Sequence, residues 1–213
     1  MIIGYTMTGY DNDSYMTGCC ERLFPEAGTV PKCEKCGYRT DYRYTNKNFV
    51  LKRKTMDFSS TYDGIDIVSL KFKEFCVRYG YENLVFVKLP KTPNFFQFYV
   101  EGNILEYDAE LKEKYCDVCG QYESVCQPII KLEKIREPLP DGFYQSDLWF
   151  ASGNEKSPIT IISPVTKEKL DRERFKNICM NKIEINKNAS DNEEFGVRQS
   201  DSVVDKKYSI RSQ

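Results

Sequence analysis

Two short cysteine loops constrain the fold of this chain more than any other feature. Each loop reads C-x-x-C-G, and together they contain Cys33, Cys36, Gly37, Cys116, Cys119 and Gly120. A C-x-x-C turn directs two sulfurs toward one point, so two such turns supply the four thiolates of a tetrahedral zinc site. The glycine after each second cysteine suits a backbone that turns at positive φ. We therefore predict one structural zinc ion, bound by all four cysteines, that joins two distant segments.

Histidine is absent from the chain, which excludes a mixed cysteine–histidine zinc site. The nine cysteines leave two alternatives open, either chance C-x-x-C matches or a pair of disulfides. A zinc ion with four thiolates carries a net negative charge, and we predict that lysines flanking the loops offset part of it. These lysines are Lys32, Lys35, Lys112 and Lys114.

Composition limits the compartment and the classes of partner. The chain has 213 residues, 40% of them hydrophobic, which is enough for one sizeable domain or two small ones. Its net charge of −1 gives no basic field of the kind that nucleic-acid-binding proteins use. The sequence shows no signal-peptide pattern and no run of the ~20 apolar residues that a membrane helix needs. We therefore expect a cytoplasmic protein with reduced thiols, where paired C-x-x-C motifs favour metal over disulfides.

Residues 66–89 and 160–183 share a strand–helix–strand pattern. Aligned without gaps, Ile67-Val68-Ser69 coincides with Ile161-Ile162-Ser163, and the final serine of each triplet is placed to cap a helix. This pattern predicts a duplicated unit, with chance similarity as the alternative. The predicted fold class is α+β, in one zinc-stabilised domain over residues 1–185 that contains both units.

Shorter patterns predict further strands and a tail. The predicted strands are 1–10, 49–51, 94–100 with 104–107 as its hairpin partner, and 129–135. The stretch 186–213 is polar, mixed in charge and poor in apolar residues, and we predict that it is a C-terminal tail.

The other cysteines receive no metal-binding role. Cys76 lies on the apolar side of the first predicted helix and Cys179 on a predicted strand, so we interpret both as small buried hydrophobic residues. Cys19 and Cys20 are adjacent, and adjacent side chains diverge on an extended chain, so we interpret them as structural. The sequence assigns no role to Cys126.

The order of these features resembles the double-CXXCG motif family of bacterial proteins over about residues 1–185. The two cysteine loops carry the resemblance, supported by an Asp147–Phe150 "DLWF" segment and by the second strand–helix–strand pattern. Members of that family are associated with immunity to polymorphic toxins. The resemblance implies a protein that binds and neutralises a cognate toxin, and it implies no catalytic residues.

The sequence leaves two alternatives to this immunity function. One is a redox role for a C-x-x-C loop, which requires a helix N-terminus that lowers the thiol pKa, and the flanking sequence does not indicate one. The other is a zinc-ribbon-like nucleic-acid-binding or regulatory protein. That alternative requires a basic stripe with interleaved aromatic residues, which the sequence lacks. We predict no enzymatic activity, because histidine is absent and a zinc ion held by four thiolates has no open position for water. The predicted partner is a protein toxin, with neither a membrane nor nucleic acid involved.

Overall fold

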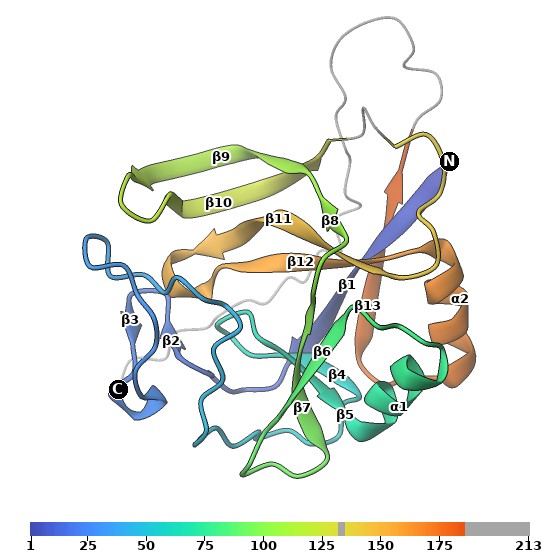
Figure 1. The fold of residues 1–213 in the computed structure, drawn as a ribbon, viewed down its shortest axis with the longest axis horizontal. Helices are drawn as coiled ribbons and strands as arrows, with labels where there is room; N and C mark the ends of the chain where they lie inside the picture. The colour runs from blue at the N-terminus through green and yellow to red at the C-terminus, as the bar shows by residue number, and fades with distance from the viewer. Residues whose placement is uncertain (132–134, 186–213) are drawn as a thin grey trace, which may run out of the picture.

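The main feature of the described chain is one sheet of eleven strands, against which two α-helices pack (Figure 1). The structure is a computed structural model, and it describes residues 1–131 and 135–185. The predicted α+β class is confirmed in this coarse form, as a mixed fold that is mostly sheet. The predicted tail at 186–213 lies outside the described residues.

The elements follow one another in a simple order. The strands of the large sheet are β1 (Ile2–Asp11), β4 (Phe58–Ser60), β5 (Asp66–Ser69), β6 (Leu84–Lys88), β7 (Phe95–Val100), β8 (Ile104–Leu105), β9 (Tyr107–Cys116), β10 (Gln121–Ile130), β11 (Phe143–Ser152), β12 (Ser157–Ile162) and β13 (Ile178–Glu184). A separate two-stranded ribbon contains β2 (Gly18–Cys19) and β3 (Arg22–Leu23). The helices are α1 (Leu70–Arg78) and α2 (Pro164–Glu173), and short 3₁₀ turns are η1 (Pro25–Ala27) and η2 (Gly153–Glu155).

The predicted N-terminal strand is confirmed as β1, which lies in the middle of the sheet. One edge of β1 pairs with β13 over residues 2–9. β1 also pairs with β12 at residues 5–7, antiparallel, and with β4 only at residues 10 and 11, parallel. The sheet is therefore discontinuous beside Thr8 and Gly9, which pair with neither β12 nor β4.

Both predicted strand–helix–strand segments have their three elements. In each, a further strand lies between the two strands and runs antiparallel to both, namely β7 between β5 and β6 and β1 between β12 and β13. Both predicted caps are confirmed, since Ser69 Oγ accepts from the Phe72 N–H at 3.2 Å and Ser163 Oγ from the Thr166 N–H at 2.9 Å. The shared order does not show a duplication, which stays a prediction.

Phenylalanine rings form the centre of the largest core cluster. The Phe72 ring of α1 is fully buried and lies 5.6 Å from Phe98 of β7 and 5.3 Å from Phe175, which follows α2. The helices lie side by side on the sheet (Figure 1), and Arg78 of α1 pairs with Glu173 of α2 at 2.7 Å. Both helices therefore close one hydrophobic core on the same side of the molecule.

Three of the predicted strands are wrong in pairing or extent. Residues 104–105 form β8, but β8 pairs with β11 rather than with β7, so the predicted hairpin does not form. Residues 49–51 form no strand. They lie in a loop in which Phe49 and Leu51 are buried, and the Leu51 N–H donates to the Thr92 hydroxyl group rather than to a neighbouring strand. Of the strand predicted at 129–135, residues 129–130 form the end of β10, which begins at Gln121, and residues 132–134 lie outside the described residues.

Candidate metal centre

The two C-x-x-C-G loops occupy different kinds of turn. The second loop is the tip of the long hairpin formed by β9 and β10, which extends from the sheet at the upper left of Figure 1. The first loop is a small turn, closed by a bond from the Cys33 N–H to the Tyr38 carbonyl at 2.9 Å. Gly37 and Gly120 have φ of 77° and 70°, so the predicted positive-φ glycines are confirmed.

All four predicted ligands meet at one point. The Sγ atoms of Cys33, Cys36, Cys116 and Cys119 lie within 4.8 Å of one another. The closest pairs join the two loops, with Cys33 Sγ 3.8 Å from Cys116 Sγ and Cys36 Sγ 3.7 Å from Cys119 Sγ. A tetrahedron with metal–sulfur bonds of about 2.3 Å has edges of about 3.8 Å, whereas a disulfide measures about 2.0 Å. The arrangement is thus compatible with a metal ion and not with disulfides.

Hydrogen bonds and burial shift the pKa values of three of these thiols in different directions. The backbone N–H of Cys119 donates to Cys116 Sγ and lowers the pKa of that thiol to about 6. Burial raises the pKa of the Cys36 and Cys119 thiols. Four neighbouring thiolates repel one another, so full deprotonation requires a positive ion between them. The site therefore has the chemistry of a cation-binding centre, with one thiolate ready at neutral pH.

A buried lysine outside the predicted set interacts electrostatically with this centre. Lys35 pairs with Asp117 and Lys114 with Glu123, so their charges are directed toward carboxylates. Lys156, by contrast, is only 2% exposed, and its ammonium group donates to the Tyr122 carbonyl. Burial lowers the pKa of Lys156, and the charges of Cys36 and Cys119 act in the opposite direction. No sequence signal identified Lys156, because it lies far from both loops along the chain.

Arg39 fixes the first cysteine loop to the rest of the sheet. The residue is 1% exposed, and its guanidinium group donates to the carbonyls of Asp63 at 2.8 Å and Lys156 at 2.6 Å. Its backbone N–H donates to Asn154 at 2.8 Å, and its carbonyl accepts from Gln121, close to the second loop. Through these bonds Arg39 positions both loops, and sequence reasoning missed it.

The remaining cysteines lie outside the cluster. Cys76 is fully buried, as predicted, and burial raises the pKa of its thiol well above the usual range. Cys179 was also predicted to be buried, but it is only half-buried on β13. Cys19, Cys20 and Cys126 are half-buried free thiols. The four-sulfur set thus consists only of the predicted ligands.

Comparison with known proteins adds no relative. No family model, curated protein or solved structure matches this chain. Within the described residues, neither helix has the length and apolar character needed to cross a membrane.

Proposed function

We propose that Cys33, Cys36, Cys116 and Cys119 bind one structural zinc ion. The observation that carries this proposal is the meeting of sulfurs from two distant loops, 83 residues apart along the chain, at separations typical of a zinc tetrahedron. Four protein ligands complete the coordination of zinc and leave no position for water or substrate, so the role is structural rather than catalytic.

On this scaffold, we propose, the chain acts as an immunity protein that binds and neutralises a cognate bacterial toxin. The resemblance to the double-CXXCG family suggests this function. The hairpin tip supports a binding role, because Tyr115 and Val118 are 60% and 64% exposed within a loop that the metal would hold rigid. A preorganised loop loses little conformational entropy when it contacts a partner.

The charges around the centre favour a protein partner over nucleic acid. Basic side chains on and beside the second loop are paired with carboxylates, as in Lys112–Asp108 and Lys114–Glu123. Paired lysines contribute little to the counterion release that drives nucleic-acid binding. The alternative of a zinc-ribbon-like nucleic-acid-binding or regulatory protein therefore has the weaker support.

We also propose that the two strand–helix–strand units are a duplication. Gly80 coincides with Arg174 in the gapless alignment, and both residues adopt positive φ, at 71° and 53°, where each helix ends. The capping serines also coincide, and each unit has a third strand between its own two. Alignment of related sequences tests this, because a duplication predicts similarity between the units within each relative.

Native mass spectrometry of the tagged protein, purified from its own host cells, tests both main proposals. We expect one zinc per chain and a second polypeptide, whose sequence names the target. Co-expression of this chain with that polypeptide should then restore the growth of cells that the polypeptide alone inhibits. A protein without metal contradicts the zinc proposal, and zinc without any polypeptide partner contradicts the immunity proposal.

Two serine variants sharpen this experiment. Cys33→Ser should lose the zinc, thermal stability and protection together. Cys126→Ser is the matched control, because Cys126 is a half-buried free thiol outside the cluster. A Cys33→Ser protein that stays folded and protective would sink the structural role of the metal.

A further inference from the structure

A cleft of about 330 Å³ lies where the sheet is discontinuous beside Thr8 and Gly9. Its floor is formed by Met7, Thr8 and Gly9 of β1, the residues at which the partner of β1 changes from β12 to β4. The volume falls at the lower end of the range of small-ligand sites, about 300–1,000 Å³. The cleft therefore has room for a small group and its alkyl chain.

Asp66 of β5 provides a carboxylate in the wall of this cleft. One oxygen accepts from Ser60 Oγ at 2.6 Å and the other from Thr160 Oγ1 at 3.4 Å. Burial raises the pKa of Asp66 to about 7. Hydroxyl groups satisfy its hydrogen bonds but leave its negative charge without a counter-charge.

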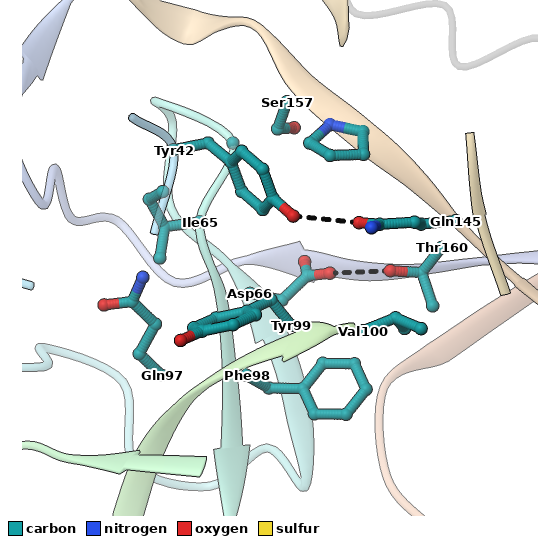
Figure 2. Close-up of a pocket in the computed structure, with 12 residues that line it drawn as sticks. Tyr42, Ile65, Asp66, Gln97, Phe98, Tyr99, Val100, Gln145, Ser157 and Thr160 are labelled. Atoms are coloured by element: carbon teal, nitrogen blue, oxygen red, sulfur yellow. Dashed lines mark hydrogen bonds between the residues drawn. The ribbon is translucent and has the colours of Figure 1, made fainter. Parts of the chain in front are cut away.

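A second, smaller cavity lies beside the same carboxylate. Figure 2 shows Asp66 directed at Thr160, with Tyr42 and Gln145 joined by a hydrogen bond of 2.9 Å in the same wall. The two cavities share Asp66 and Thr160, but the second holds only about 20 Å³, the space of one water molecule. A ligand that reaches Asp66 must therefore enter through the larger cleft.

The larger cleft combines negative, aromatic and apolar groups. Glu155 also lines the cleft, and its carboxylate accepts from the Cys20 N–H at 3.0 Å. None of the ion pairs among residues 1–131 and 135–185 includes Asp66 or Glu155. Tyr62 also lines the cleft and is 41% exposed, while Phe150 and Ile159 add apolar surface.

We propose that this cleft binds a guanidinium or primary ammonium group carried on an alkyl chain. Asp66 and Glu155 supply the counter-charges, and the hydroxyl groups of Ser60 and Thr160 hold the Asp66 carboxylate in place. Because the face of an aromatic ring attracts cations, we expect the Tyr62 ring to contact the charged head group. The apolar lining then contacts the methylene chain. The cation comes from a free amine or from a basic side chain of a partner protein.

Agmatine and the peptide acetyl-Gly-Arg-Gly-amide are probes for these two sources, with acetyl-Gly-citrulline-Gly-amide as the neutral control. Binding is followed by the backbone amide signals of Gly9 and Gly64, which line the cleft. We expect saturable shifts with both cations and none with citrulline. Tighter binding of agmatine assigns the cleft to a free amine, and tighter binding of the peptide assigns it to a basic side chain.

Charge-removing variants decide whether Asp66 is responsible. Asp66→Asn keeps the shape of the side chain and should weaken binding about tenfold or more. Glu155→Gln should also weaken binding, whereas Asp171→Asn, which alters an exposed pair with Lys167, should leave it unchanged. Equal binding by wild type and Asp66→Asn, or no saturable shift with either cation, overturns the proposal. These results do not depend on zinc or on a toxin, so the proposed function stands or fails separately.

Discussion

Asp63 and Asp66 lie three residues apart beside the same turn, yet the groups that surround their two carboxylates differ. Asp63 is fully buried and accepts from the backbone N–H groups of Met16 and Thr17 at 2.8 and 2.7 Å, with the Arg39 guanidinium 4.0 Å away. Asp66 accepts from two hydroxyl groups, and no ion pair within the described part of the chain includes it. A buried charge with its partners is part of the scaffold, and one without a counter-charge is a candidate binding group.

The same distinction applies to the buried cations. Arg39 lies against Asp63, whereas Lys156 lies within the electrostatic reach of Cys36 and Cys119. Lys156 and Arg39 are also joined, since the Lys156 carbonyl accepts from the Arg39 guanidinium. The metal centre and the Arg39–Asp63 centre therefore form one connected region.

The largest effect should come from breaking the Arg39–Asp63 centre. Asp63→Ala removes the acceptor for three backbone N–H groups and leaves the Arg39 charge buried without its partner. We expect a loss of about 3–5 kcal/mol in the free energy of unfolding, measured by urea denaturation. Asp41→Ala, which breaks only the exposed pair with Arg43, should cost less than about 1 kcal/mol. Equal losses for the two variants would contradict the structural role of Asp63.

Asp66→Asn should raise the free energy of unfolding at neutral pH, whereas Asp63→Ala should lower it. The pKa of Asp66 is raised from 3.8 to about 7, so the folded protein binds more protons than the unfolded chain between these values. Its contribution to stability is fully present below pH 3.8 and is lost as the pH rises through about 7. The asparagine variant lacks this loss, and above pH 7 we expect it to be more stable than wild type by an amount on the order of 3 kcal/mol.

The measurement is the difference in free energy of unfolding between wild type and Asp66→Asn at pH values from 4 to 8. Glu155 and Tyr62 line the cleft with Asp66 and are present in both proteins, so the two proteins differ only at Asp66. A difference that stays constant across this range would show that Asp66 has an ordinary pKa.

Lys156→Met should have an intermediate effect, confined to the metal centre. Loss of a buried positive charge close to the thiolates weakens metal binding by about tenfold, in the range found for groups that support metal ligands. Competition with a zinc chelator measures the affinity. Lys114→Met is the control, because the Lys114 side chain is 73% exposed and pairs with Glu123 instead. If both variants bind zinc with wild-type affinity, Lys156 has no role at the centre.

These residues also show how far the sequence alone can predict the molecule. The meeting of the four cysteines was predictable because C-x-x-C-G is a local pattern typical of metal sites, and the helix caps at Ser69 and Ser163 were predictable for the same local reason. Asp66 was read only as the first residue of a strand. Its cleft exists because β1 changes partners from β12 to β4, which no local pattern encodes.

Long-range pairing explains the other failures. The β9–β10 hairpin was missed because its strands are rich in charged residues, with both faces of β9 largely exposed. Arg39 and Lys156 resemble ordinary surface residues in the sequence. They are buried only because the first cysteine loop packs against the corner between β11 and β12, where Asn154 accepts from the Arg39 N–H.

The smallest expected effect comes from an exposed ion pair beside the cysteine cluster. Lys35 and Asp117 join the two cysteine loops directly, at a distance of 2.5 Å, but their side chains are 57% and 70% exposed. Water screens this pair, so Lys35→Ala should change the free energy of unfolding by less than about 0.5 kcal/mol and leave zinc affinity nearly unchanged. Chelator competition and urea denaturation, run beside Lys156→Met, measure both. A larger loss of zinc affinity for Lys35→Ala than for Lys156→Met would show that proximity in sequence to the ligands, rather than burial, determines which cation supports the centre.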